Sequence, residues 1–261
     1  MNLTIVKVGG KVVEEDNSLS ALLDDFASLT GAKALVHGGG RSATKLSEQL
    51  GIQAQMIEGR RVTDAQTLRI VTMVYAGLVN KNIVAQLQAR GVNALGLTGA
   101  DMGIIRSDRR APKMMSDGQL VDFGFVGDVR EVHTDTISSL IKQEVVPVLS
   151  PITHDGKGNL LNTNADTIAS EFARAMAGIA NVKLVFCFEK PGVLLNPDDD
   201  NTLIPDLDFD TFKDYQAKGI VAAGMIPKLD NGFEALRKGV HSVVITNVQG
   251  LKSGRGTTLK L

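Results

Sequence analysis

The chain is poor in the residues that mark disulfide-rich, metal-clustered and nucleic-acid-binding proteins. Its 261 residues include a single cysteine, Cys187, which excludes an internal disulfide and any site built from several cysteines. Tryptophan is absent and aromatic residues make up only 4%, so the core has to be aliphatic. The formal net charge is -1, which gives no global field to attract nucleic acid or an anionic membrane.

Long hydrophobic runs are missing as well. No stretch approaches the roughly 20 apolar residues that a membrane span requires. The N-terminus enters an apolar run at residues 3–8 without the basic region that precedes a signal-peptide core. We therefore expect a cytoplasmic protein without nucleic-acid or membrane partners. Cys187 lies in the apolar run 182–188, where a buried and unreactive thiol is expected.

Short β-branched runs alternate with longer segments of helical periodicity along the chain. This alternation predicts an α/β fold, an open αβα sandwich whose mostly parallel central sheet is covered by helices on both faces. Such sheets bind ligands outside the carboxyl ends of their strands. The predicted strands are 3–8, 32–36, 93–97, 145–150, 182–188, 242–247 and 257–261, and the predicted helices are 18–29, 42–50, 134–144, 164–176, 208–218 and 225–239.

Two stretches depart from the simple alternation. Residues 63–90 form a long helical pattern that we interpret as two helices. Residues 102–129 contain short apolar alternations broken by Gly, Asp and basic residues, which predicts antiparallel hairpins that include 104–107 and 121–129. A boundary near residues 176–180 would divide the chain into an N-terminal lobe, 1–176, and a smaller C-terminal lobe, 177–261.

Glycine is abundant, at 27 residues, and clusters where predicted strands end. Lys7-Val8-Gly9-Gly10 closes the first strand, where glycines let backbone N–H groups turn toward an anion. Taken alone, the same segment is better explained as a tight turn beside a solvated lysine. It matches neither the P-loop pattern nor the dinucleotide-binding pattern.

His37-Gly38-Gly39-Gly40 closes the second strand and precedes a predicted helix. Bare glycine amides at a helix N-terminus attract phosphate or carboxylate. Three consecutive glycines are costly to order, which favours binding over a structural turn. We expect His37 to be a hydrogen-bonding residue at the strand end rather than a catalytic base.

Two further segments place polar residues at helix starts. In Asn162-Thr163-Asn164-Ala165-Asp166, Asn164 suits a helix cap and Asp166 suits the helix dipole, but together they also suit orienting a lysine. In Gly224-Met225-Ile226-Pro227-Lys228, the proline suits a first turn, where the charge of Lys228 is unfavourable for the dipole. Lys228 is either an exposed surface lysine or the partner of an anion.

Together with Gly59-Arg60-Arg61-Val62-Thr63-Asp64, these four segments span nearly the whole chain and, in this order, resemble the amino acid kinase family. The resemblance implies two lobes, one binding an acylated amino acid and the other binding ATP with Mg²⁺. It is strongest to the members that transfer the γ-phosphoryl group of ATP to the γ-carboxylate of N-acetylglutamate, in the second step of arginine biosynthesis.

The resemblance also implies roles for individual residues. The catalytic group would be Lys7 and Lys228, which approach the phosphoryl group from opposite lobes, with Asp166 holding both. The substrate would be bound by Gly38, Gly39, Arg61 and Asn162. No dedicated metal ligand is implied, because Mg²⁺ would be carried on the phosphates of ATP. The implied phosphate and ATP contacts are Gly9, Gly10, Glu189, Gly192, Leu194, Ile220, Val221 and Ala222.

Some segments differ from the family pattern, so the substrate is not fixed by the resemblance. Glu189 and Lys190 change the polar chemistry of a nucleotide turn, and residues 220–223 are apolar where polar or glycine residues are common. Residues 102–129 also diverge, so N-succinylglutamate or another acyl amino acid is an alternative substrate. A kinase for a carbamate, a nucleotide or a carrier-linked amino acid, and a non-catalytic metabolite sensor, also stay open as functions. The presence of both lysines disfavours the sensor.

Relatives that sense arginine carry an extra helix ahead of the first strand and form hexamers. This chain begins directly at its first predicted strand. The resemblance therefore implies a homodimer that arginine does not inhibit.

Overall fold

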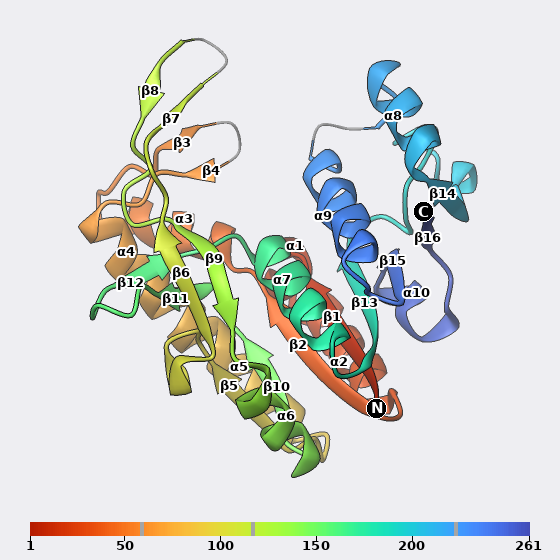
Figure 1. Ribbon diagram of the computed structural model, residues 1–261, viewed down its shortest axis with the longest axis horizontal. Coiled ribbons are helices and arrows are strands. Elements are labelled where there is room, and N and C mark those ends of the chain that lie inside the picture. Colours follow the sequence, from red (N-terminus) through yellow and green to blue (C-terminus); the bar gives the residue numbers. More distant parts are fainter. Residues whose placement is uncertain (58–59, 116–117, 222–223) are drawn as a thin grey trace.

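In the computed structural model, which describes residues 1–57, 60–115, 118–221 and 224–261, an eight-stranded sheet runs through the molecule (Figure 1). Its strands are β1 Asn2–Val8, β2 Ala32–His37, β5 Ala94–Leu97, β10 Val146–Leu149, β13 Asn181–Phe188, β14 Asp206–Asp208, β15 Ser242–Asn247 and β16 Thr257–Lys260. They lie in the order β14-β16-β15-β13-β1-β2-β10-β5. Neighbours are parallel except for β15 and β16. The predicted α/β fold with a mostly parallel sheet is confirmed.

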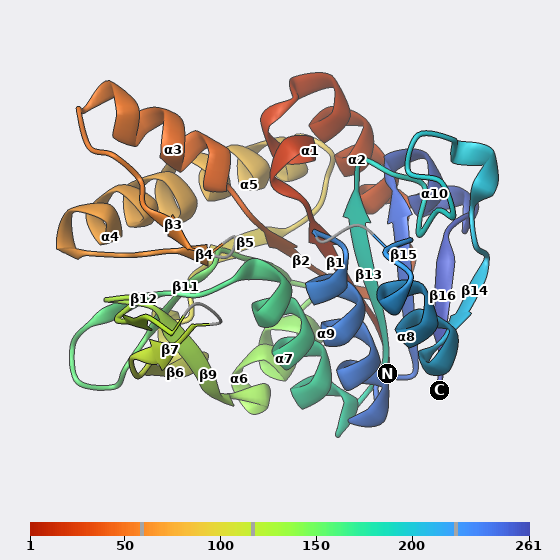
Figure 2. The same ribbon diagram turned by 90° about the horizontal axis from the view of Figure 1, so that it is seen from above.

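Helices cover both faces of the sheet (Figure 2). One face carries α1 Gly10–Glu14, α2 Asp16–Ser28, α3 Gly40–Gln49, the helical stretch of residues 65–88 and α10 Val248–Ser253. The other face carries α6 Thr134–Lys142, α7 Ala165–Ala177, α8 Phe209–Ala217 and α9 Ile226–Arg237. The short helices α1 and α10 were not predicted, because five or six residues give too little periodicity to recognise.

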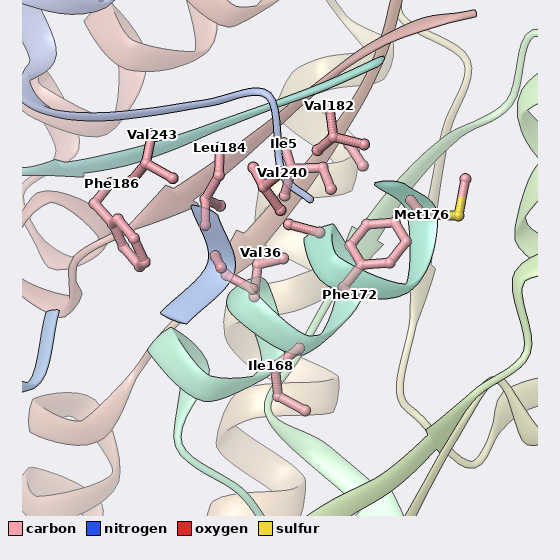
Figure 3. Packing of buried hydrophobic residues seen from close by; sticks show 14 of the residues in the cluster. Ile5, Val36, Ile168, Phe172, Met176, Val182, Leu184, Phe186, Val240 and Val243 are labelled. Carbon is pink, nitrogen blue, oxygen red and sulfur yellow. The ribbon is translucent and has the colours of Figure 1, made fainter. Parts of the chain in front are cut away.

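Side chains of each central strand alternate between two apolar clusters, one on each face of the sheet. In β1, Leu3 and Ile5 join the cluster under α7 and α9, which Figure 3 shows around Phe172. Val6 and Val8 join the cluster on the opposite face. The same alternation turns Lys7 toward the face covered by α7 and α9, which decides where its ammonium group can reach.

Beside the large sheet lies a four-stranded sheet in the order β12-β11-β6-β9. Its strands are β6 Ile105–Arg109, β9 Gly127–Val132, β11 Ile152–His154 and β12 Leu160–Asn162, and two short hairpins pair β3 Met56–Ile57 with β4 Arg60–Arg61, and β7 Lys113–Met114 with β8 Leu120–Val121. The predicted antiparallel pairing is present in β6 with β9.

The segment 121–129, predicted to belong to the antiparallel hairpins, contributes to two strands, β8 and β9. It is split because Gly124 turns the chain at φ 73°, and its N–H donates to Asp122 Oδ1 at 2.8 Å. A side chain at position 124 would also lie 2.2 Å from the carbonyl oxygen of Thr63. This turn docks the hairpin region on Thr63, next to Arg61.

Residues 65–88 form one continuous helical stretch instead of the two helices predicted. It consists of α4 Ala65–Val71, a π-helical segment Thr72–Val79 and α5 Asn80–Gln88. By length and composition alone its 24 residues would suffice to cross a membrane, contrary to the expectation that no stretch approaches that length. Val71, Val74 and Ile83 are buried against the sheet, as expected of a core helix in a soluble protein.

The order of the strands creates a switch point at β1. The chain continues from β1 to β2 on one side, and β13 later pairs along the other side with Asn2 opposite Asn181 and Val8 opposite Cys187. Strands β13 to β16 therefore come from residues after 180, while β1, β2, β5 and β10 come from residues before 150. Ligands of open α/β sheets bind at such a point, beyond the carboxyl ends of the strands.

Candidate active site

A cavity of about 510 Å³ opens at the carboxyl ends of β1 and β2. It contains the side chains or backbone of segments that are far apart in sequence and that were all predicted to contribute to the site. Those that line it are Lys7, Gly9, Gly10, Gly38, Gly39, Arg61, Asn162, Glu189 and Lys228.

The centre of the site is a carboxylate held between two lysines. Lys7 Nζ lies 2.7 Å from Asp166 Oδ1, and Lys228 Nζ lies 3.2 Å from Asp166 Oδ2. Lys7 is near the end of β1, Asp166 is in the first turn of α7, and Lys228 is in the first turn of α9. The three residues thus come from three elements, and Lys228 is not a free surface lysine.

Local structure explains why Asp166 sits where it does. The side chain of Asn164 caps α7 by accepting hydrogen bonds from the N–H groups of Asp166 and Thr167, at 2.8 and 3.1 Å. Asp166 then occupies the first turn, where a negative charge is favoured by the helix dipole. Asn164 therefore caps the helix, while Asp166 both suits the helix dipole and pairs with the two lysines. From the sequence alone, these roles are alternative explanations for the two residues.

Burial and charge compete at Asp166. The residue is 7% exposed and Lys7 is 6% exposed. Burial acts to raise the pKa of Asp166, but the charges of Lys7 and Lys228 outweigh it and hold the pKa below its usual value. The carboxylate is therefore ionised at neutral pH. Two cations against one anion leave a positive balance at the cavity wall, which suits an anionic ligand.

The two glycine loops pack against each other. A side chain at Gly38 would meet the backbone N of Gly10 at 3.7 Å, and one at Gly9 would meet Phe188 Cβ at 3.3 Å. At Gly39, φ is 157° and a side chain would lie 2.9 Å from Tyr75. Gly39 in particular has no room for a side chain, and the packing of the two loops leaves backbone amide groups at the cavity.

Arg61 has one guanidinium nitrogen free for a ligand. Its Nη2 donates to the carbonyl of Gly40 at 2.9 Å and to Thr44 Oγ1 at 2.7 Å. Its Nη1 is buried and has no hydrogen-bond partner among the residues that the structure describes. A buried, unpaired charged donor is costly, so this nitrogen is suited to an acceptor from a ligand. Nearby, Asn162 Nδ2 donates to Thr63 Oγ1 at 3.0 Å.

A second cavity, of about 300 Å³, adjoins the first. Phe188, Glu189 and Lys228 line both cavities, so Lys228 lies where the two meet. Of the predicted nucleotide contacts, those that line the second cavity are Glu189, Gly192, Leu194, Ile220 and Val221. Ala222, and Gly59 of the Arg61 segment, lie outside the described residues.

His37 is buried and neutral. Its Nδ1 lies 2.8 Å from the carbonyl oxygen of Gly38, and its Nε2 lies 3.0 Å from Asn80 Nδ2. Because a carbonyl can only accept, Nδ1 carries the proton and Nε2 accepts from the amide of Asn80. Burial, together with the charges of Lys7 and Lys81, lowers the pKa of His37 to about 4 despite the bond to Gly38. His37 is the hydrogen-bonding residue that the sequence suggests.

Sequence reasoning missed several residues of the cavity wall. These are Lys11, Arg41, Thr44, Arg60, Tyr75 and Arg110. Arg60 lies inside the segment Gly59 to Asp64 but was given no role, Lys11 and Arg41 each follow a glycine segment that was identified, and Arg110 belongs to no recognisable motif. Tyr75 lies in the middle of an apolar helical pattern, where only its polar tip distinguishes it from a core residue.

Comparison with known proteins agrees with this geometry. The sequence pattern of the amino acid kinase family matches residues 2–247. An acetylglutamate kinase of Bacteroides thetaiotaomicron is 58% identical over 258 residues, covering 99% of this chain and 98% of that protein. An acetylglutamate kinase of Methanopyrus kandleri is 40% identical, covering 99% of this chain and 100% of that protein.

Solved structures share the fold. N-acetylglutamate synthase from Neisseria gonorrhoeae, complexed with coenzyme A and N-acetyl-glutamate, superposes with a TM-score of 0.80 at 22% identity, covering 99% of this chain and 59% of that one. The protein smu.665 from Streptococcus mutans gives a TM-score of 0.78 at 25% identity, covering 99% and 98%. From its sequence pattern and its full-length relatives, the chain belongs to the amino acid kinase family.

Proposed function

We propose that this enzyme transfers the γ-phosphoryl group of ATP to the γ-carboxylate of N-acetyl-L-glutamate, giving N-acetylglutamyl 5-phosphate in the second step of arginine biosynthesis. The observation that carries the proposal is the pair Lys7 and Lys228, both bound to the buried Asp166 where two cavities meet. Support also comes from acetylglutamate kinases that match the chain over nearly its full length.

The acyl amino acid would bind in the 510 Å³ cavity, on residues of the N-terminal lobe 1–176. The unpaired Nη1 of Arg61 suits the α-carboxylate, which a planar guanidinium binds better than an ammonium group. Asn162 would bind the α-substituents, and the backbone of Gly38 and Gly39 would bind the reacting carboxylate. The substrate then lies with its γ-carboxylate toward Lys7.

ATP would bind on the side of the C-terminal lobe 177–261. Leu194, Ile220 and Val221 give the 300 Å³ cavity an apolar wall that suits a nucleobase. The backbone of Gly9 and Gly10 would contact the phosphates, and Lys228 lies between the cavities, where the γ-phosphate would arrive.

In the reaction, an oxygen of the γ-carboxylate attacks the γ-phosphorus. The bond from that phosphorus to the bridging oxygen breaks, and the electron pair leaves with ADP. A carboxyl group of pKa about 4.3 is already ionised near neutral pH, so no general base is needed. Lys7 and Lys228 stabilise the charge on the transferring group, and Asp166 holds both ammonium groups in place.

Kinase chemistry implies Mg²⁺, which neutralises phosphate charge. Among residues 1–57, 60–115, 118–221 and 224–261, no group of three or more His, Cys, Asp or Glu side chains is arranged to hold a metal ion. Asp166 is already bound by two lysines, so the donor set fits an ion carried on the phosphates of ATP.

The same proposal extends to assembly and location. Three large apolar side chains are exposed at one end of the sheet, with 54% of Met73, 68% of Leu78 and 38% of Leu95 accessible. They lie on the helical stretch of residues 65–88 and on the edge strand β5. A second copy of the chain would cover these side chains and form a homodimer. The homodimer would be located in the cytoplasm.

An ATP-dependent hydroxamate assay tests the proposal. Purified enzyme is incubated with ATP, Mg²⁺, hydroxylamine and one of N-acetyl-, N-succinyl- and N-formyl-L-glutamate or free glutamate. We expect N-acetyl-L-glutamate to give the highest kcat/KM. Preference for the succinyl compound would retain the chemistry and change the substrate. Absence of acyl phosphate with every compound would refute the proposed function.

A further inference from the structure

The helical stretch of residues 65–88 changes its winding where it passes the active site. α4 is followed by the π-helical segment Thr72–Val79 and then by α5. A π-helix bonds each N–H group five residues back; it is rare, mostly limited to single turns, and frequent at functional sites. A π-helical segment of eight residues therefore needs an explanation in the contacts that its side chains make.

Tyr75, from the middle of the π-helical segment, packs on the substrate-side glycine loop. A side chain at Gly39 would lie 2.9 Å from Tyr75 Cδ1, and one at Gly40 would lie 4.0 Å from the Tyr75 hydroxyl oxygen. The ring is 5% exposed and lines the cavity. Burial raises the pKa of Tyr75 and the charge of Arg61 opposes this, so the phenol is near that guanidinium.

Asn80, the first residue after the π-helical segment, holds the same loop at its other end. Its amide donates to His37 Nε2 at 3.0 Å and to the carbonyl of Val148 at 2.9 Å. His37 Nδ1 in turn donates to the carbonyl of Gly38 at 2.8 Å. Asn80 is 1% exposed, and a side chain at Gly96 would lie 1.9 Å from its Oδ1. The buried Asn80 amide therefore occupies the space that a side chain at position 96 would need.

The winding explains how both residues reach one loop. Tyr75 and Asn80 are five positions apart, which is the hydrogen-bond spacing of a π-helix and brings them toward the same side. In an α-helix of 3.6 residues per turn, five positions separate two side chains by about 140° around the axis. α-Helical winding would turn one of the two away from the loop.

We propose that the π-helical segment Thr72–Val79 is the support of the glycine loop His37 to Gly40, and that Tyr75 and Asn80 are positioning residues for binding the acyl amino acid. Tyr75 presses on Gly39, and Asn80 fixes Gly38 through His37. The inference rests on the proposed function, because that loop is the proposed site of the substrate's reacting carboxylate.

The test compares Tyr75→Leu, Tyr75→Phe and Asn80→Ala with wild type and with Asn82→Ala. The last variant is a matched control, because Asn82 is an exposed asparagine two positions after Asn80. For each folded protein, kcat and the two KM values, for N-acetyl-L-glutamate and for ATP, are measured. If Asn80→Ala does not fold, Asn80→Ser, which keeps a small donor, replaces it.

Tyr75→Leu and Asn80→Ala are expected to raise KM for N-acetyl-L-glutamate about ten-fold and to change KM for ATP less than about two-fold. Tyr75→Phe keeps the ring on Gly39 and should stay within about three-fold of wild type, and Asn82→Ala should match wild type. Unchanged KM values in Tyr75→Leu and Asn80→Ala, with only the amount of folded enzyme reduced, would overturn the inference. Equal rises in both KM values would overturn it too. Inactive wild-type enzyme would instead refute the proposed function.

Discussion

At the scale of single residues, the site depends on how three charges share a buried position. Lys7 and Lys228 each bind one oxygen of Asp166, at 2.7 and 3.2 Å. All three residues could be identified from the sequence, because each adjoins a glycine-rich or helix-capping motif. The contact of one carboxylate with both lysines was implied only by the family resemblance, because it is made between α7, α9 and β1 and no local motif contains all three residues.

The first prediction concerns the two lysines. Lys7→Ala and Lys228→Ala should each lower kcat by about 100-fold or more and change both KM values much less, because the ammonium groups stabilise charge that develops during transfer. Steady-state kinetics check this. Lys218→Ala is the control, since Lys218 is exposed and pairs only with Asp214, four positions earlier, among its described contacts. A change confined to KM would show that the lysines bind only ground states.

The second prediction concerns Arg61. Arg61→Ala should raise KM for N-acetyl-L-glutamate by about 100-fold, because a charge-assisted hydrogen bond to the α-carboxylate is lost. Arg61→Lys should recover little, because an ammonium group cannot reproduce both the bonds to Gly40 and Thr44 and a further bond from Nη1. KM for ATP serves as the internal control. An unchanged KM for the acyl amino acid would remove Arg61 from the site.

The third prediction uses the buried His37. Its pKa falls from 6.5 to about 4 on folding, so between these values the unfolded chain binds more protons than the folded one. Stability is therefore fully present above pH 6.5 and declines as the pH falls, by about 3 kcal/mol at pH 4. Urea unfolding at pH 7, 6 and 5 measures the slope.

His37→Gln supplies the control for that slope. The amide of glutamine can donate and accept but does not titrate in this range. The variant should lose stability less steeply than wild type between pH 7 and 5. Asp166 does not interfere, because its lowered pKa confines its own loss to pH values near and below 3.8. Parallel slopes for the two proteins would contradict the buried, neutral imidazole.

At the scale of elements, strands with a buried repeat and helices with strong periodicity were predictable, whereas the connecting pieces were not. β1, β2, β13 and β15 match their predicted positions within one or two residues. The break inside the predicted hairpin segment 121–129 could not be predicted, because the turn at Gly124 is imposed by docking on Thr63. The π-helical segment could not be predicted, because residues 72–79 are almost uniformly apolar and show no period that distinguishes one winding from another.

The fourth prediction separates helix capping from catalysis. Asn164 caps α7, the helix that carries Asp166. Asp208 caps α8, and no residue of α8 lines either active-site cavity. Asn164→Ala and Asp208→Ala should each reduce stability by about 1 kcal/mol in urea unfolding. Only Asn164→Ala should also lower kcat, because it frees the first turn that positions Asp166. Equal kcat values for the two variants would show that the cap does not position Asp166.

At the scale of the whole molecule, the shared sheet joins the two halves of the chain. The parallel sheet and the order of its strands along the chain were predictable from the sequence, but the spatial order was not, because any of several crossovers satisfies the same alternation. The placement of β13 against β1 brings Glu189 beside the glycine loops and sets the two cavities side by side.

The fifth prediction concerns assembly. Leu78→Glu places a charge on the apolar end of the sheet and should convert the proposed homodimer to monomers in light scattering after gel filtration. Leu195→Glu is the control, because Leu195 is 48% exposed on a loop of the other half of the sequence. A wild-type monomer, or a Leu78→Glu dimer, would contradict the proposed interface.

The central claim, that two lysines held by Asp166 assist transfer of a phosphoryl group to a carboxylate, is tested most directly by ³¹P NMR of the products. Wild-type enzyme with ATP, Mg²⁺ and N-acetyl-L-glutamate should give an acyl phosphate and ADP in equal amounts, and Lys228→Ala should give neither at a comparable rate. Formation of pyrophosphate with an acyl adenylate, or of ADP with inorganic phosphate as the only initial product, would contradict the claim.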